Sequence, residues 1–199
     1  SSDLLGDNLS TGHFAADMAA VSASGTYGVI GCGTVGLLAI AAAKQLGARE
    51  IIAVDPCQPR LQIAESLGAL TFSSPQKALQ HVKSLTHGRG LDGVMELVGL
   101  PTAQDLSYEM VRPGGTLSVI GCHCTPHFSF SPADAYDKNL TYRTGRCPAR
   151  HYMNLLSTDP KVCDMDLSWC ITHHFPVTDA VDAYRIFSKR EDGCVKAVL

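Results

Sequence analysis

The chain of 199 residues is 45% hydrophobic and 18% charged, and its 16 Lys and Arg against 19 Asp and Glu give a formal net charge of −3. This balance is typical of a chain with a sizeable hydrophobic core and excludes an intrinsically disordered protein. Lys and Arg are scattered singly between acidic residues rather than gathered in a stripe, which argues against a nucleic-acid partner.

Short apolar, β-prone runs alternate with segments of helical periodicity from residue 10 to residue 120. Ser10 is expected to cap the first helix, over residues 10–21. Expected strands cover residues 27–30, 51–54, 69–72, 92–98 and 116–120, and expected helices cover residues 34–46, 60–67, 76–85 and 102–110. This alternation predicts a parallel sheet covered by helices on both faces, which is a doubly wound α/β fold.

The pattern changes after Gly121, where proline, histidine and aromatic residues cluster. Further strands are expected at residues 140–144, 171–175 and 194–198, with helices opening near residue 149 and covering residues 178–187. We place a domain boundary at residue 145, between residues 1–145 and residues 146–199. A tail of about fifty residues is marginal as an independent core, so we expect it to be loosely held and to complete a sheet whose other strands lie outside the chain.

Two features bear on the compartment. The eight cysteines show no structural-zinc spacing, and no signal peptide opens the sequence, so we interpret them as reduced thiols of a cytoplasmic protein. Residues 21–43 carry no charge before Lys44, but their many glycines and hydroxyl residues lower the hydrophobic density. We therefore expect no membrane span.

A glycine-rich turn, GCGTVG at residues 31–36, follows the first expected strand and opens a helix. In such a turn Gly31 allows the sharp bend, Gly33 lets the backbone approach a pyrophosphate, and Gly36 packs helix against strand. The helix N-terminus supplies positive potential. The turn predicts dinucleotide binding, although a glycine-rich connection can also serve close packing alone.

Asp55 stands at the end of the next strand, at the distance from the glycines that suits a ribose-binding acid. Its charge would repel a phosphate on the 2′ oxygen, so Asp55 favours NAD over NADP. The alternative is an acid that caps the helix after Pro56. Arg60 could reach the adenine or lie solvated on its helix.

Several short stretches together carry a family resemblance. They are GDNLSTG at residues 6–12, the turn at 31–36, VD at 54–55, ELVG at 96–99, VRPGG at 111–115 and DGCVK at 192–196. In this order they resemble the zinc-dependent medium-chain alcohol dehydrogenases, and most of all members similar to glutathione-independent formaldehyde dehydrogenase and threonine dehydrogenase.

The resemblance implies an oxidoreductase with an NAD-binding Rossmann domain and a GroES-like catalytic domain that holds zinc. Its reaction would be hydride transfer between the nicotinamide and a small alcohol or aldehyde, with zinc polarising the substrate oxygen. The match covers the family's later half, the cofactor domain and the returning part of the catalytic domain. The half with the cysteine and histidine zinc ligands has no counterpart here, so we expect this chain alone to be inactive.

The resemblance also assigns residues. Asp7 falls at the position of a zinc ligand, although it can equally shape a turn, and Lys196 falls at a pyrophosphate contact, although it can equally be a solvated edge charge. The remaining matches contact the nicotinamide and its ribose: Thr11, Val35, Val98, Cys122 and Arg146. A second metal at Cys122, His123, Cys124 and His127 is a weaker alternative, because the family has a nicotinamide-lining loop there.

The expectation is thus part of an NAD-dependent, zinc-containing alcohol dehydrogenase, which we expect to form a homodimer or homotetramer through the cofactor domain. Residues 136–144 are the expected pairing edge. The alternative is a cofactor-binding module without turnover, which acts by binding NAD or a partner protein. The sequence does not identify the alcohol, since most of the substrate pocket lies in the absent half.

Overall fold

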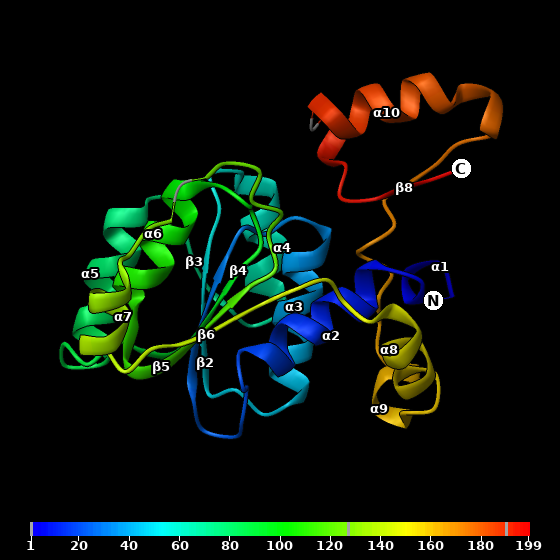
Figure 1. The fold of residues 1–199 in the computed structure, drawn as a ribbon. Helices are drawn as coiled ribbons and strands as arrows, with labels where there is room; N and C mark the ends of the chain where they lie inside the picture. Colours follow the sequence, from blue (N-terminus) through cyan, green and yellow to red (C-terminus); the bar gives the residue numbers. More distant parts are fainter. Residues whose placement is uncertain (1, 127, 190) are drawn as a thin grey trace.

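A six-stranded parallel sheet forms the centre of the computed structural model, which describes residues 2–126, 128–189 and 191–199 (Figure 1). The strand order is β3-β2-β1-β4-β5-β6, and every neighbouring pair is parallel. The strands are β1 (Thr26–Ile30), β2 (Glu50–Val54), β3 (Leu70–Phe72), β4 (Leu91–Glu96), β5 (Val111–Val119) and β6 (Thr141–Thr144). This order confirms the doubly wound Rossmann fold expected from the alternation.

Helices cover both faces of the sheet, as Figure 1 shows. Along β2, Ile51 and Ala53 join the buried cluster on the side of α2 and α3, whereas Ile52 and Val54 join the cluster on the side of α5 and α6. Since alternate residues of a strand point to opposite faces, an apolar run without polar alternation is buried on both. The covering helices are α2 (Asn8–Met18), α3 (Thr34–Gln45), α4 (Gln58–Ser66), α5 (Pro75–Leu85) and α6 (Pro101–Met110).

One expectation about the first long helix was wrong. Helix α2 begins at Asn8, with Asp7 as its N-cap residue, so Ser10 lies inside the helix and does not cap it. The Ser10 side chain is buried and donates a hydrogen bond of 2.6 Å to the carbonyl oxygen of Leu5, in the short helix α1 (Ser2–Leu5). A buried hydroxyl needs a hydrogen-bond partner, and the Leu5 carbonyl oxygen at the end of α1 is that partner for Ser10.

The first part of the tail packs against helices at the start of the chain. Helices α8 (Ala149–Leu156) and α9 (Pro160–Cys163) contribute to a third buried cluster with α1, α2 and α3. The ring of Tyr152 meets that of Phe14 edge-on at 5.7 Å, and its hydroxyl donates to Asp17 at 2.7 Å. The tail is therefore not uniformly loose.

The last part of the chain extends away from the sheet (Figure 1). Its two short strands pair in parallel, which confirms their expected positions, although each is shorter than expected. Helix α10 leaves Val181 and Tyr184 82% and 72% exposed. The elements are β7 (His173–His174), the 3₁₀ turn η1 (Val177–Asp179), α10 (Ala180–Lys189), the 3₁₀ turn η2 (Glu191–Gly193) and β8 (Ala197–Val198).

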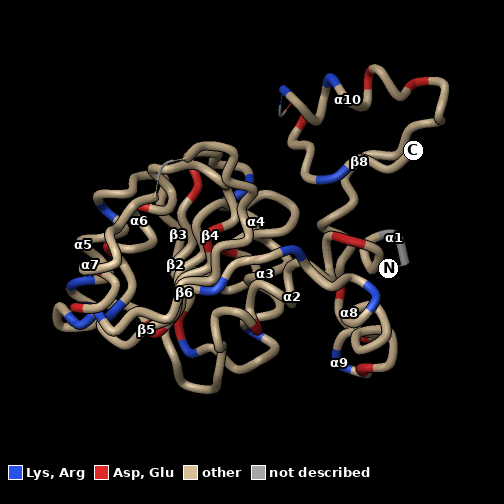
Figure 2. Tube along the Cα trace, viewed as in Figure 1, with Lys and Arg blue, Asp and Glu red and all other residues tan. Residues whose placement is uncertain are grey.

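A short helix that the sequence analysis missed precedes β6. Helix α7 (Pro132–Asp137) begins with a reciprocal cap in which Ser131 and Asp134 bond each other's backbone N–H groups. None of the helices in the described ranges has the length and apolar character needed to cross a membrane. Acidic and basic residues are interspersed along the trace in Figure 2, and all eight cysteines are free.

Candidate dinucleotide site

The three glycines after β1 have different structural roles. Gly31 has a φ of +93°, and a Cβ there would lie 2.6 Å from Val98 Cγ2. A Cβ on Gly36 would collide with the carbonyl oxygen of Gly31. A Cβ on Gly33 would meet only the Arg60 guanidinium, at 3.9 Å, so packing requires Gly31 and Gly36 but leaves open space at Gly33.

The N-terminus of α3 faces this open space without a capping side chain. Gly33 is the N-cap residue, and no side chain caps the helix. The nearest hydroxyl, that of Thr34, donates instead to the carbonyl oxygen of Val195 at 2.7 Å. The N–H groups of the first helical turn have no partner within a helix, and they lie at its positive end. The turn therefore suits a phosphate group approaching over Gly33.

Asp55 links the glycine turn to the end of β2. Its side chain is buried, Oδ2 accepts a hydrogen bond from the Cys32 N–H, and Oδ1 accepts one from the Cys57 N–H, both at 2.8 Å. Helix α4 begins at Gln58 with Cys57 as its N-cap residue, so Asp55 does not cap that helix. The guanidinium nitrogen Nη1 of Arg60 lies 4.0 Å from Asp55 Oδ2. Burial and the Asp55 carboxylate raise the pKa of the Cys32 thiol to about 12, which keeps Cys32 protonated.

The structure brings most of the expected adenosine-side residues to one cavity of about 470 Å³. It is bounded by the carboxyl ends of β1, β2 and β4 and by helix α6. The expected adenosine-side residues that line it are Gly31, Gly33, Asp55 and Arg60, and Val98, which was assigned to the nicotinamide and its ribose, lines it as well. A ligand that entered this cavity would meet both the open glycine and the buried acid.

A second cavity, of about 670 Å³, gathers the residues assigned to the nicotinamide side. Asp7, Thr11, Cys122 and Arg146 line it, together with the segments that follow β5 and β6. Thr11 Oγ1 donates to Asp7 Oδ1 at 3.2 Å. These residues are far apart in the sequence, and the carboxyl ends of β5 and β6 bring them together.

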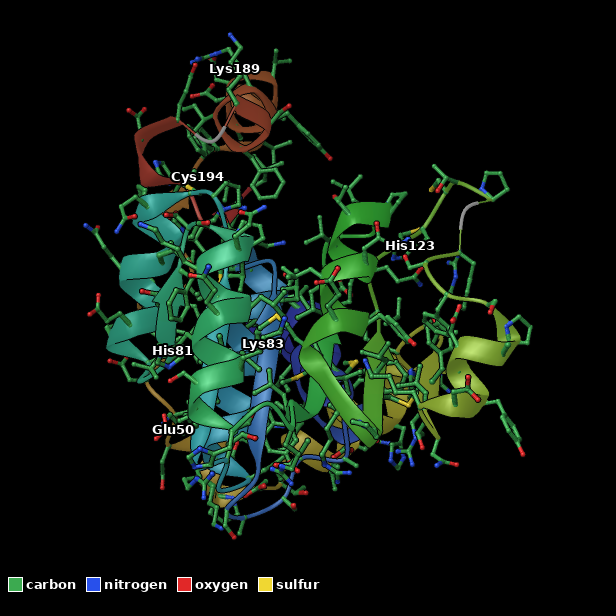
Figure 3. All side chains as sticks on the ribbon, turned by 90° about the vertical axis from the view of Figure 1, so that its left-hand side faces the viewer. Glu50, His81, Lys83, His123, Lys189 and Cys194 are labelled. Carbon is green, nitrogen blue, oxygen red and sulfur yellow. The ribbon has the colours of Figure 1, made fainter. Side chains whose placement is uncertain are left out.

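The two cavities lie at the same end of the sheet. Figure 3 shows His123 and Cys194 at this end and Glu50, the first residue of β2, at the other. The strand order reverses between β1 and β4, whose carboxyl ends bound the smaller cavity. In open α/β sheets, ligands bind outside the carboxyl ends of the strands at such a switch point.

Three of the expected residues do not line these cavities. Gly36, in the first turn of α3, packs against the backbone of Gly31. Val35 is half-buried in the first turn of α3. Lys196 lines a separate cavity of about 190 Å³ with Tyr184 and Phe187, beside α10. The backbone next to Lys196 does reach the glycine turn, through the Thr34–Val195 bond. A contact between Lys196 and a pyrophosphate stays a prediction.

The sequence analysis missed a carboxylate–imidazole contact between buried Glu96 and half-buried His123. Glu96, the last residue of β4, is fully buried, and its Oε2 lies 2.8 Å from His123 Nε2. His123 lines the larger cavity. The ELVG stretch and the histidine after β5 were both visible in the sequence, but no local spacing connects them.

The described residues contain no group of three or more His, Cys, Asp and Glu side chains that could hold a metal ion. A catalytic zinc normally has three protein ligands, and Asp7 is one carboxylate. Its neighbour Cys147 is a half-buried thiol whose pKa is raised by burial. In the weaker alternative cluster, His127 lies outside the described residues, and Cys124 Sγ donates to the Cys122 carbonyl oxygen at 3.7 Å.

Comparison with known proteins gives consistent matches along the chain. Residues 34–157 match the family described as zinc-binding dehydrogenase. The chain is 36% identical over 200 residues to zinc-type alcohol dehydrogenase B of Aspergillus flavus, covering 93% of this chain and 45% of that protein. It is 34% identical over 184 residues to L-threonine 3-dehydrogenase of Bacillus subtilis, covering 89% of this chain and 51% of that protein.

A solved structure shares the fold. The alcohol dehydrogenase TADH of a Thermus species superposes with a TM-score of 0.90 at 33% sequence identity, covering 98% of this chain and 56% of that one. The chain thus spans about half the length of the relatives it matches.

Proposed function

Because the chain belongs to the zinc-binding dehydrogenase family, we propose that it binds NAD across the carboxyl ends of its sheet, as the cofactor-binding part of an NAD-dependent alcohol dehydrogenase. The adenosine half of the cofactor lies in the cavity beside Asp55 and Arg60. The nicotinamide half lies in the cavity beside Thr11, Cys122 and Arg146.

The observation that carries this proposal is the open space at Gly33. Packing explains the absence of a side chain at Gly31 and Gly36 but not at Gly33, where a Cβ would meet little. The same space lies against an uncapped helix N-terminus. A pyrophosphate fits both features, because it needs close backbone approach and N–H donors.

At the nicotinamide end, the residues of this chain bind and orient. A bound NAD would supply the acceptor for a hydride from the alcohol. Thr11 and Val98 limit where the nicotinamide and its ribose can lie, and the backbone at Cys122 and Arg146 holds the carboxamide. Holding the ring at a fixed distance from a second reactant is the main contribution that such a domain makes to rate.

Zinc enters this proposal only through the longer protein. The described residues do not form a zinc site among themselves. Asp7 is our candidate for the one ligand that this chain contributes. The substrate class, a small alcohol or aldehyde, follows from the family alone, and assembly into a homodimer or homotetramer is part of the same proposal.

A second function is favoured by one observation. The described residues form both of the cavities that a dinucleotide would occupy. They contain no group of three or more metal-binding side chains that could form a zinc centre. A chain with these properties can bind NAD without turnover. Titration of NADH tests the binding that both functions require. An alcohol oxidation assay of the longer protein separates them, since this chain alone is expected to be inactive under either function.

The test of cofactor binding is Gly33→Ala. The φ of Gly33 is −68°, so alanine fits without strain, and the melting temperature should stay within about 2 °C of wild type. The new methyl group would stand where the pyrophosphate approaches, so the Kd for NADH should rise at least about tenfold. Gly6→Ala is the matched control, because Gly6 also has open space around it. Equal NADH affinity of the two variants would contradict the proposal.

A further inference from the structure

Glu96 connects the two loops that separate the cavities. On the side of its own loop, Oε1 accepts hydrogen bonds from the N–H groups of Val98 and Gly99, each at 2.8 Å. A fully buried carboxylate is costly unless donors surround it, and here two backbone donors turn the chain sharply after β4. Glu96 therefore fixes the course of the loop that carries Val98.

The same residue also holds the loop after β5. Its carbonyl oxygen accepts from the N–H groups of Ile120 and Gly121, both at 3.0 Å. Its second carboxylate oxygen, Oε2, lies 2.8 Å from Nε2 of His123. Since a carboxylate offers only acceptors, Nε2 is the donor in this pair. One side chain thus bonds to both loops.

The loops approach too closely to move independently. Gly99 has a φ of +81°, and a Cβ there would lie 2.6 Å from the carbonyl oxygen of Cys122. A Cβ on Gly121 would collide with the Gly99 N–H and lie 2.6 Å from Glu96 Oε2. A side chain at either position would collide with the opposite loop, so both positions require glycine.

This junction borders both cavities. Val98 lines the smaller cavity and is 43% exposed, and His123 lines the larger one next to Cys122. His123 lies at the end of the sheet opposite to Glu50, as Figure 3 shows. A shift of the loop after β5 would therefore move a wall of the larger cavity, which holds the nicotinamide half in the proposed function.

We propose that Glu96 and His123 are positioning residues which lock the loops after β4 and β5 together and so shape the nicotinamide half of the cofactor site. The inference rests on the proposed NAD binding. His123 lines the larger cavity and not the smaller one, which is bounded by the carboxyl ends of β1, β2 and β4 and by α6. Loss of the pair should consequently weaken binding of the nicotinamide half and spare the adenosine half.

The His123 imidazole contacts Glu96 through only one of its two nitrogens. His123 Nδ1 is buried, and no hydrogen-bond partner for it exists in the described chain. Only Nε2 connects the ring to Glu96. A glutamine side chain can present an amide N–H near the position of Nε2, so His123→Gln should restore the lock, whereas His123→Phe keeps a ring and removes the donor.

The experiment compares two ligands on the folded chain, NADH and ADP-ribose, which lacks the nicotinamide. For His123→Phe we expect the Kd of NADH to rise at least about fivefold while that of ADP-ribose changes less than about twofold. His123→Gln should bring the NADH value back to within about twofold of wild type. Melting curves of both variants establish that the chain is folded at the temperature of the titration.

The experiment distinguishes four results that contradict the inference or the proposed function. Unchanged NADH binding by His123→Phe would overturn the inference. So would equal losses for NADH and ADP-ribose, which indicate a general structural role, and so would failure of His123→Gln to restore binding. If wild type binds neither ligand, the proposed function itself fails, and this result is distinct from the other three.

Discussion

At the scale of single residues, the chain has structural acids of two kinds. Asp55 and Glu96 are buried at the carboxyl ends of β2 and β4, and each uses its carboxylate to accept hydrogen bonds from loop N–H groups near the two cavities. Asp92 lies near the amino end of β4 and bonds Thr26 and Arg112. The first kind shapes the site, and the second stabilises the fold away from it.

Asp55 leads to a prediction about cofactor choice. Wild type should bind NADH at least about tenfold more tightly than NADPH, because a 2′-phosphate beside a carboxylate costs on the order of 1.4 kcal/mol or more. Asp55→Asn should narrow that ratio to about threefold or less. Fluorescence titration with both cofactors measures it, with Asp164→Asn, an exposed site outside both cavities, as the control. Equal affinities in wild type would contradict the assignment of Asp55.

Asp92 leads to a prediction about acid stability. Burial raises the pKa of this carboxyl, but hydrogen bonds from Thr26 and Arg112 outweigh burial and hold it at about 2. Because the folded pKa lies below the unfolded one, the stabilisation is complete above about pH 4 and is lost as the pH falls toward 2. Asp92→Asn should lower the unfolding free energy at pH 7 by about 1–2 kcal/mol.

The measurement is urea unfolding of wild type and Asp92→Asn between pH 2 and pH 7. The difference between the two proteins should shrink below about pH 4 and nearly vanish at about pH 2. Asp164→Asn, the same chemical change at an exposed site, should show a small difference at every pH. A difference between Asp92→Asn and wild type that does not depend on pH would show that the charge of Asp92 is not the stabilising feature.

At the scale of elements, the tail divides at about residue 170. Helices α8 and α9 bury Tyr152, Leu156 and Val162 against α1, α2 and α3. Helix α10 keeps an exposed apolar side, and the hydrogen bond between Thr34 and Val195 connects the last segment to the first turn of α3. An amphipathic helix with one exposed apolar side normally packs against another element.

Hydrogen exchange should reflect this division. Amides of β1, β2 and β4 should exchange most slowly and those of α8 at intermediate rates, because local opening costs more where more apolar area is buried. Amides of α10, β7 and β8 should exchange fastest. Exchange followed by mass spectrometry on the intact chain measures all of them. Protection of α10 equal to that of the central strands would show that the last segment is a self-sufficient unit.

At the scale of the whole molecule, the sheet has two free edges. Strand β3 forms one edge and β6 the other. Three of the four residues of β6 are exposed, and Tyr136 of the preceding helix is 83% exposed. An open edge strand presents unpaired backbone groups that can pair with a second chain. The expected pairing edge, residues 136–144, therefore includes an edge of the sheet.

We expect two copies to associate through β6. Sedimentation equilibrium should give a mass that rises toward twice that of the chain, and the amides of residues 141–144 should become more protected as concentration increases. The opposite edge, β3, serves as an internal control and should show no concentration dependence. A monomer at all concentrations, or stronger protection at β3, would contradict this mode of assembly.

The sequence by itself determined the doubly wound fold, the glycine turn and the position of Asp55. These features depend on short-range rules: alternation of buried runs, the steric freedom that glycine provides after β1, and the distance between consecutive strands. The strands at 27–30 and 51–54 were located to within one residue for the same reason, because an apolar run bounded by turn residues has few alternatives. The capping role of Ser10 failed because a carbonyl of the preceding helix competed for its hydroxyl.

Only the tertiary structure decided which loops meet. Glu96 and His123 come from adjacent strands, and their contact depends on strand order and on how closely Gly99 and Gly121 let the loops approach. The gathering of Asp7 and Thr11 with Arg146, and the packing of α8 on α2, likewise require segments distant in the chain to be brought together by burial of apolar area. Local sequence patterns do not predict which distant segments come into contact, because the hydrophobic effect is non-directional and depends on the apolar area that is buried.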